Sequence, residues 1–250
     1  MNKPQIQYLH FSVVESTNAL ASSYLDEDLN MDWLVISTDS QSKGRGQMGT
    51  TWQDVPRQNV LMSVVSPKIS WPISRVFELN IAVSLAIHKV LSPFVNIELK
   101  WPNDLLVRRK KLGGILIEPS VRGSFVHRMI IGVGINVLQK EWSQGVEATS
   151  LSLEALVEPE IPELRRRLAE KISVELERII RTGQVDKEEY LSLCVGYQAW
   201  GEYLEGEKSF KAKFIDIDGN GRQILELEDG SRQAFDLKEV RMNLNQSFSS

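Results

Sequence analysis

Apolar residues in this chain occur in short runs separated by polar turns, and three longer segments have a helical period. The short runs are rich in Val, Ile and Leu, and we expect strands at residues 33–38, 59–65, 97–101, 104–107, 112–121 and 125–137. Residues 74–91 are apolar on nearly every side, which predicts a buried helix. Residues 162–181 and 186–194 have one apolar face each, which predicts two amphipathic helices.

The pattern of apolar runs and turns changes near residue 201. Short strands and glycine turns follow, with Asp218-Gly219-Asn220-Gly221 as the clearest turn, and this pattern predicts a small SH3-like β-barrel. Before residue 201, hairpins are mixed with helices and do not alternate in βαβ units. We therefore expect an α+β protein, with a mixed sheet covered by helices in residues 1–200 and the barrel in residues 201–250.

Composition narrows the class of protein. The 250 residues are 42% hydrophobic and 25% charged, which is ordinary for a globular protein, and the net charge of −4 argues against nucleic acid as a partner. We find no leader pattern and no apolar run of ~18 residues, so we expect a cytoplasmic protein without a membrane partner. The single cysteine, Cys194, fits a reducing compartment. The three histidines have no spacing that suits a metal site or a Ser-His-Asp triad.

Two polar segments near the N-terminus could bind a ligand. Ser16-Thr17-Asn18 is sufficient as a plain helix N-cap, but capping hydroxyls and amides also bind the polar head of a buried ligand. Residues 41–52 are polar and carry glycines at 44, 46 and 49, which a simple turn would explain. A polar loop of this length is more typical of a binding loop. Within it Arg45 offers a planar fork for a phosphate or carboxylate, and Trp52 can stack on a base.

Two later segments add cations and flat backbone. Lys111 stands just before Gly113-Gly114 in an expected strand, although a solvated basic hairpin tip would account for the same pattern. In residues 130–137 glycines alternate along an apolar strand, which exposes a flat wall or lets a helix pack closely. Asn136 beyond them has the paired donor and acceptor that suit an adenine edge. Together the four segments describe a site that adenylates a small carboxylic acid.

These segments also resemble, in their order, the motifs of the biotin–protein ligases, and the resemblance extends from about residue 8 to residue 240. It is carried by Glu15-Ser16-Thr17-Asn18, Gln41 through the Gly44-Arg45-Gly46 loop to Trp52, Lys100-Trp101-Pro102-Asn103-Asp104, Lys111-Leu112-Gly113-Gly114-Ile115-Leu116-Ile117-Glu118 and Gly132-Val133-Gly134-Ile135-Asn136. The resemblance implies a class II synthetase-like catalytic fold and two half-reactions. Biotin and ATP give biotinyl-5′-AMP and pyrophosphate, and biotin then passes to a lysine of a biotin carboxyl carrier protein.

The resemblance further implies a role for individual residues. Lys111 and Arg45 are the implied catalytic residues, Lys111 because a fixed ammonium stabilises the approach of a carboxylate to a phosphate. Mg²⁺ would neutralise the pyrophosphate, with Asp104 as a candidate ligand. The implied biotin-binding residues are Ser16, Thr17, Asn18, Gln41, Gly44, Arg45, Gly46, Gly114 and Gly132. The implied ATP- and adenylate-binding residues are Arg45, Gln47, Trp52, Asn103, Lys111 and Asn136.

The chain departs from many relatives in two respects. It begins almost directly at the catalytic part, so we expect a form without the N-terminal DNA-binding domain of biotin-responsive repressors. Gln47, Met48 and Thr50 stand where many relatives carry arginines, so we hypothesise weaker retention of the adenylate. The alternatives are a lipoate or octanoate ligase, a non-catalytic biotin-binding regulator and a β-rich interaction module. We expect a monomer or a weak homodimer.

Overall fold

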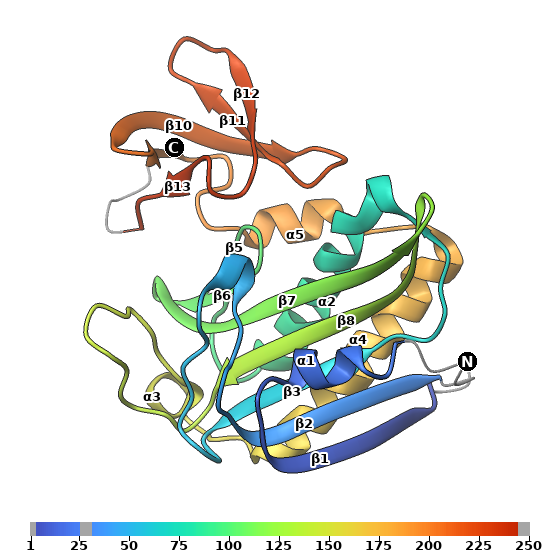
Figure 1. Ribbon diagram of the computed structural model, residues 1–250. Helices are drawn as coiled ribbons and strands as arrows, with labels where there is room; N and C mark the ends of the chain where they lie inside the picture. The colour runs from blue at the N-terminus through green and yellow to red at the C-terminus, as the bar shows by residue number, and fades with distance from the viewer. Residues whose placement is uncertain (1–3, 26–31, 245–250) are drawn as a thin grey trace.

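The computed structural model describes residues 4–25 and 32–244, and its larger part is built on one eight-stranded mixed sheet (Figure 1). The strands lie in the order β1-β2-β3-β8-β7-β6-β5, with β4 paired to β8. β1 runs parallel to β2, and all other neighbours are antiparallel. The strands are β1 (Ile6–Val14), β2 (Trp33–Gln41), β3 (Asn59–Val65), β4 (Trp71–Pro72), β5 (Glu98–Lys100), β6 (Asp104–Val107), β7 (Lys110–Arg122) and β8 (Phe125–Asn136).

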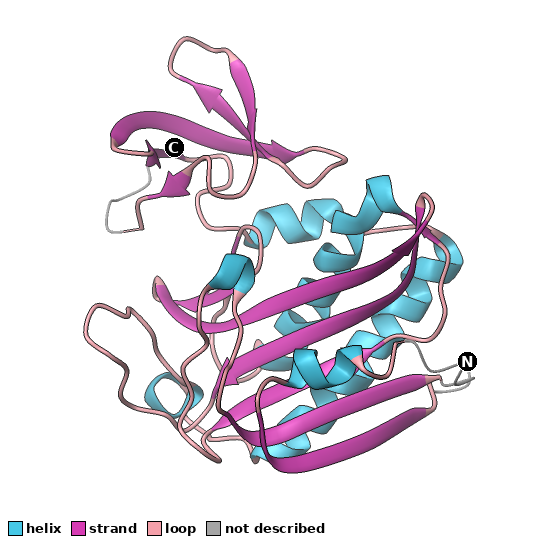
Figure 2. Ribbon diagram, viewed as in Figure 1, coloured by secondary structure: helices cyan, strands magenta, loops and turns pink. Residues whose placement is uncertain are grey.

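Helices cover both faces of this sheet (Figure 2). α2 (Val76–Leu91) and α4 (Ile161–Thr182) pack against each other behind the sheet, and α1 (Thr17–Ser22) lies in front of it (Figure 1). The other helical elements are α3 (Leu151–Glu154), α5 (Lys187–Leu193) and the 3₁₀ turns η1 (Gln47–Gly49) and η2 (Ile73–Arg75).

The residues of β2 alternate between the two faces of the sheet. Trp33 and Val35 belong to the main core under α2 and α4, whereas Leu34 and Ile36 join Ala21 of α1 in a smaller cluster. Both faces of β2 are therefore buried, which explains why the sequence reads there as a continuous apolar run. The smaller cluster holds α1 on the front face, where its first residues form one wall of a cavity.

From Trp200 onward the chain forms a separate antiparallel sheet in the order β12-β11-β10-β9-β13. Its strands are β9 (Trp200–Glu205), β10 (Lys208–Ile217), β11 (Gln223–Leu227), β12 (Arg232–Phe235) and β13 (Arg241–Met242). In the described part of the chain β12 and β13 are its outer strands and do not pair with each other. The SH3-like barrel and the domain boundary at residue 201 therefore remain predictions.

The C-terminal sheet contacts the larger part of the molecule at the turn before β11. Trp101 Nε1 donates a hydrogen bond to the Gly221 carbonyl at 3.0 Å. Gly221 has a φ of 88°, and a Cβ placed on it would lie 2.6 Å from the ring of Phe77. Glycine is therefore needed here both for its backbone conformation and for the close approach of α2.

The α+β class, the mixed sheet and the six strands expected in it are confirmed. Strand β1 was not predicted, because none of its residues is fully buried and its sequence lacks the apolar run of the inner strands. Cys194 is buried, and burial raises its pKa, as a packed thiol requires. In residues 4–25 and 32–244 no helix has the length and hydropathy to cross a membrane.

Candidate functional site

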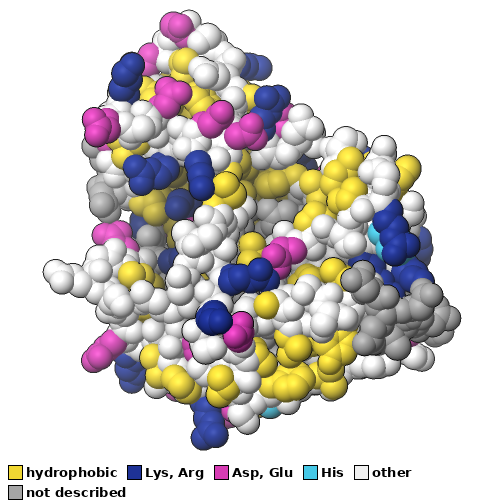
Figure 3. Space-filling model, in the orientation of Figure 1, with side chains coloured by type: hydrophobic (Ala, Val, Ile, Leu, Met, Phe, Trp, Pro, Cys, Tyr) yellow, Lys and Arg dark blue, Asp and Glu magenta, His cyan; other side chains and the backbone are white. Residues whose placement is uncertain are grey.

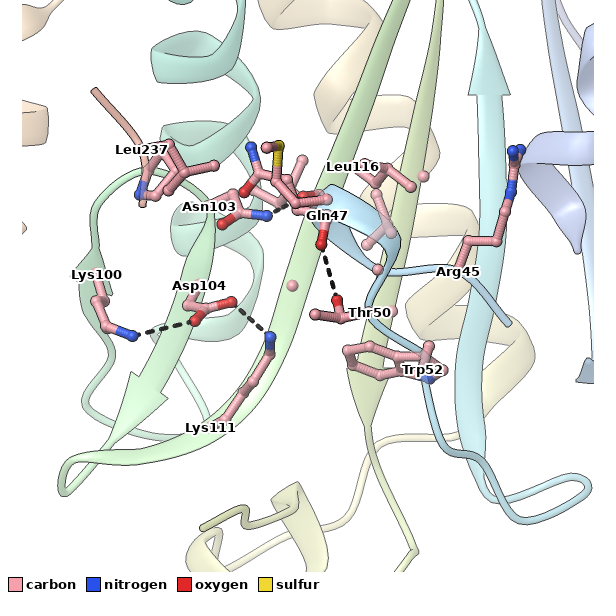
Figure 4. Close-up of a pocket in the computed structure, with 18 of the residues that line it drawn as sticks. Arg45, Gln47, Thr50, Trp52, Lys100, Asn103, Asp104, Lys111, Leu116 and Leu237 are labelled. Atoms are coloured by element: carbon pink, nitrogen blue, oxygen red, sulfur yellow. Dashed lines mark hydrogen bonds and ion pairs between the residues drawn. The ribbon is translucent and has the colours of Figure 1, made fainter. Parts of the chain in front are cut away.

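One cavity brings together segments that are far apart in the sequence. Its volume is about 430 Å³. It is lined by the start of α1, the loop after β2, the turn between β5 and β6, the middle of β7 and β8, and residues 237–242 of the C-terminal part (Figure 4). Each of the four segments that the sequence singled out contributes to this lining.

A buried polar cluster forms one wall of the cavity. The backbone N–H of Thr17 donates to Gln41 Oε1 at 2.8 Å, which joins the start of α1 to the end of β2. Ser63 Oγ lies 2.8 Å from Thr17 Oγ1 and 2.5 Å from Asn18 Oδ1. Ser16 caps α1 by accepting a hydrogen bond from the Ala19 N–H, so the capping segment also lines the cavity. Sequence reasoning missed Ser63, because its position in an apolar run gave no signal.

Glu118 is a second residue that the sequence did not assign to the site. Its Oε2 accepts a hydrogen bond from Asn18 Nδ2 at 2.6 Å and another from Arg45 Nη2 at 3.4 Å. The Arg45 guanidinium is therefore paired with a carboxylate, and in Figure 4 it points away from Asp104 and Lys111. The expected catalytic contact of Arg45 requires this side chain to leave Glu118.

The loop between β2 and β3 contains a tight hairpin at residues 44–52. Trp52 N–H donates to the Gly44 carbonyl at 3.0 Å, and Gly46 N–H donates to the Thr50 carbonyl at 2.7 Å. A Cβ on Gly44 would lie 2.6 Å from the Trp52 carbonyl oxygen, so Gly44 is required by the hairpin and is not among the residues that line the cavity. Gly46 and Gln47 do line it.

The alternating glycines of β8 make room for protein side chains. A Cβ on Gly132 would clash with the amide of Asn18, and a Cβ on Gly134 would lie 2.7 Å from the Trp52 ring. Gly114, on the neighbouring strand, is more open, because a Cβ there would lie 3.4 Å from Lys111 Nζ. The flat wall expected from the sequence is thus occupied in part by Asn18 and Trp52, which lie over β8.

Lys111 stands at the centre of the charged end of the cavity. Its Nζ is 2.6 Å from Asp104 Oδ1 and 5.8 Å from the centre of the Trp52 ring, and Lys100 Nζ is 3.6 Å from Asp104 Oδ2 (Figure 4). The carboxylate therefore orients two ammonium groups. Asp104 shares this site with cations, and the described residues contain no group of three His, Cys, Asp or Glu side chains suited to a metal.

Two asparagines expected at the adenine are tied to the backbone. Asn103 lines the cavity, but its Nδ2 donates to the Ile115 carbonyl at 2.6 Å. Asn136 does not line the cavity: its buried Nδ2 donates to the carbonyls of Lys111 and Thr149, at 3.3 and 2.9 Å. The structure therefore gives Asn136 a supporting position beside Lys111, since its amide is tied to the Lys111 and Thr149 carbonyls.

Comparisons with known proteins show which proteins the chain resembles. A family model described as "Biotin/lipoate A/B protein ligase family" matches residues 10–136. The chain is 32% identical over 223 residues to a biotin--[acetyl-CoA-carboxylase] ligase of Mycobacterium tuberculosis, covering 85% of this chain and 80% of that protein. It is 32% identical over 135 residues to the bifunctional ligase/repressor BirA of Bacillus subtilis, of which it covers 41%.

Solved structures show the same fold. The biotin protein ligase from Aquifex aeolicus in complex with biotin and ATP superposes with a TM-score of 0.73 at 23% identity. The alignment covers 94% of this chain and 98% of that one. A biotin protein ligase from Leishmania major in complex with biotinyl-5-AMP superposes with a TM-score of 0.57 at 22% identity, covering 94% of this chain and 99% of that one.

Proposed function

The chain belongs to the biotin/lipoate A/B protein ligase family, and we propose that it is an ATP-dependent biotin–protein ligase that uses this cavity for both half-reactions. The observation that carries the proposal is the meeting, in one cavity, of a buried polar cluster around Thr17 and an ammonium group, Lys111, beside an aromatic ring. The polar cluster suits the polar head of a carboxylic acid, and the ammonium group beside an aromatic ring suits a nucleotide. The reaction between the two requires both ends in one cavity.

The polar cluster is where the biotin head binds. The ureido group of biotin has two N–H donors and one carbonyl acceptor, and it requires partners of both kinds in an apolar slot. Hydroxyls and amides of Ser16, Thr17, Asn18 and Gln41 supply both. Hydrogen bonds between Thr17 and Gln41, and between Ser63 and both Thr17 and Asn18, hold the cluster in place before the ligand arrives. Gly46, Gly114 and Gly132 border the same slot.

Lys111 acts at the other end, where the carboxylate of biotin meets the α-phosphate of ATP. Both groups are anionic, so the main barrier to their approach is electrostatic, and a fixed ammonium lowers it without proton transfer. Asp104 holds that ammonium at 2.6 Å. Arg45 leaves Glu118 to bind the adenylate, and Trp52, Asn103 and Gln47 surround the nucleotide. Asn136 supports the backbone of Lys111.

Mg²⁺ is the metal ion that this reaction would use. Asp104 is already engaged by Lys100 and Lys111, and the described residues offer no cluster of further carboxylates. These residues do not fit a metal site of the protein itself. We expect Mg²⁺ to enter bound to the phosphates of ATP, as part of the substrate.

The acceptor in the second half-reaction is a lysine of a biotin carboxyl carrier domain. This choice follows the names of the relatives, which are ligases of biotin to acetyl-CoA carboxylase. We further propose that the chain acts in the cytoplasm, as a monomer or weak homodimer, without nucleic acid or membrane as a partner.

Transfer of labelled biotin to a carrier domain tests the proposal. Wild type should label the acceptor lysine when biotin and ATP are both present. Lys111→Ala should lose about a hundredfold or more in rate, as removal of one charge-stabilising contact typically does, while it still binds biotin. Lys208→Ala, an exposed lysine of β10 outside the cavity, is the matched control. Absence of pyrophosphate release by the wild type would contradict the proposal.

Lipoate is the alternative substrate, because the matching family includes lipoate ligases. Isothermal titration with biotin and with lipoate, each in the presence of ATP, separates the two. Tighter binding of lipoate than of biotin would favour the alternative.

A further inference from the structure

Ser63 is a buried hydroxyl that lies behind the polar wall of the cavity. The outer surface of the molecule carries Lys and Arg side chains along the side of the C-terminal part that faces the larger one (Figure 3). Ser63, by contrast, is fully buried on β3 and is not among the residues that line the cavity. Its neighbours Met62 and Val64 belong to the main core, so Ser63 points to the opposite face of the sheet, against which α1 packs. Any effect of Ser63 on a ligand therefore passes through the residues that it touches.

The amide of Asn18 has one orientation that satisfies its surroundings. Its Nδ2 is 2.6 Å from Glu118 Oε2 and 3.3 Å from the Leu116 carbonyl oxygen, and a carboxylate and a carbonyl only accept hydrogen bonds. The NH₂ group therefore faces β7, and Asn18 Oδ1 lies 2.5 Å from Ser63 Oγ. Gly132, which pairs with Ser63 across the sheet, leaves room for this amide. Because a carbonyl oxygen has no proton to give, the contact between Asn18 and Ser63 uses the proton of the Ser63 hydroxyl.

The contact between Ser63 and Thr17 then uses the proton of Thr17. The two hydroxyl oxygens are 2.8 Å apart, and a hydroxyl has a single proton, which Ser63 gives to Asn18. The Thr17 hydroxyl also lies 3.3 Å from Gln41 Oε1, which is a second acceptor within the protein. With either acceptor the Thr17 proton points into the protein. The hydroxyl therefore presents lone pairs to the cavity that Thr17 lines.

Gln41 has the opposite polarity at the same end of the cavity. Its Oε1 accepts a hydrogen bond from the Thr17 N–H at 2.8 Å, and its Nε2 donates to no residue in 4–25 or 32–244. The protein thus offers a ligand an acceptor at Thr17 and a donor at Gln41. A head group in which an N–H stands beside a carbonyl matches this pair.

We propose that Ser63 is a positioning residue that fixes the Thr17 hydroxyl as an acceptor and so makes the cavity selective for a ligand head with an N–H donor. The inference rests on the proposed function and deepens it. Ser63 does not touch the ligand: it takes the proton of Thr17 because Asn18, held by Glu118, takes its own. Without Ser63, the Thr17 hydroxyl keeps only the longer contact with Gln41 and is free to rotate and donate toward the cavity.

A matched pair of ligands tests this selectivity. The first is biotin, and the second is its cyclic carbonate analogue, in which ring oxygens replace both ureido N–H groups and the carbonyl is kept. In wild type the analogue places an oxygen against the lone pairs of Thr17, so we expect it to bind at least about tenfold more weakly than biotin. In Ser63→Ala the Thr17 hydroxyl can donate to that oxygen. The preference for biotin should therefore fall about threefold to tenfold, the range that one neutral hydrogen bond supplies. Isothermal titration without ATP measures both affinities.

Two controls separate this effect from a general loss of structure. Ser66→Ala removes another buried serine, which accepts from the Met129 N–H and donates to the Pro67 carbonyl away from the cavity, and it should leave the preference unchanged. Adding Ser63→Ala to Thr17→Val should also leave it unchanged, because Ser63 acts through the Thr17 hydroxyl. Ser63→Cys, with a thiol that is a weak donor and acceptor, gives the same test should the alanine variant not fold.

The outcomes distinguish this inference from the proposed function. An equal preference for biotin in wild type and Ser63→Ala, or an equal fall in Ser66→Ala, would overturn the role of Ser63 while biotin binding by the wild type still supports the proposed function. A wild type that binds neither ligand would overturn both. A fall in preference that is confined to the Ser63 variants and disappears in the Thr17→Val background is the expected result.

Discussion

The contact between Gly134 and Trp52 should control how the cavity accepts a nucleotide. A Cβ added at Gly134 would lie 2.7, 2.8 and 3.0 Å from three atoms of the Trp52 indole. Nonbonded carbons normally lie no closer than about 3.5 Å, so the ring would have to move by roughly 0.8 Å. The β8 backbone cannot yield easily, because Gly134 is paired to β3 on one side and to β7 on the other. The strain in Gly134→Ala therefore falls on the ring.

The size of the effect follows from the cost of overpacking. Inserting a methyl group into a packed site costs about 1–3 kcal/mol. When that cost falls on binding, the affinity for ATP decreases by about fivefold to about 150-fold. Isothermal titration with ATP in the absence of biotin, so that no adenylate forms, measures this change in affinity directly. The affinity for biotin should change less, because Asn18 of the polar cluster lies against Gly132 and not against Gly134.

A double-mutant cycle decides whether the ring is the cause. Adding Gly134→Ala to Trp52→Ala should cost little further affinity, because the clashing atoms are gone. Gly219→Ala is the control, since a Cβ there has no neighbour within 4 Å. An unchanged ATP affinity in Gly134→Ala, or the same loss with and without Trp52, would refute the reasoning.

Two further predictions concern stability. Gly221→Ala combines a φ of 88° with a Cβ only 2.6 Å from Phe77. It should therefore lower the Tm by more than Gly230→Ala, where φ is a similar 81° but the surroundings are open. Equal shifts in Tm, measured by calorimetry, would contradict a role for the Phe77 contact. Burial raises the pKa of Asp54, and such a carboxyl adds stability below its unfolded-state pKa that is lost as the pH rises through the folded-state pKa. Asp54→Asn should therefore raise the urea concentration at the midpoint of unfolding at neutral pH. Near pH ~3, where the carboxyl is protonated, the midpoint should be unchanged. A lower midpoint at neutral pH would show that the charge stabilises the fold.

Local sequence carried enough information for most of the architecture. Strands β2 and β3 are buried on both faces for most of their length, so they read as apolar runs, and α2 is apolar on nearly every side because it packs against α4 and α5 as well as into the core behind the sheet. Strand β1 escaped prediction because it is an edge strand with no fully buried residue. The motifs around Ser16, Arg45 and Lys111 were also visible, because residue type and spacing carry their chemistry.

What the sequence determined by itself is the set of chemical groups: the capping hydroxyls, the glycine loop, the lysine before paired glycines and the family to which they belong. The tertiary structure alone decided their partners. Asn136 and Lys111 are 25 positions apart, and their contact through a backbone carbonyl follows from strand pairing, which no local pattern encodes. In the same way, Glu118 pairs with Arg45, Ser63 contacts Asn18, and Lys238 lines the cavity. Three-dimensional packing, and not spacing along the chain, decides which charges are neutralised and which stay free for a ligand.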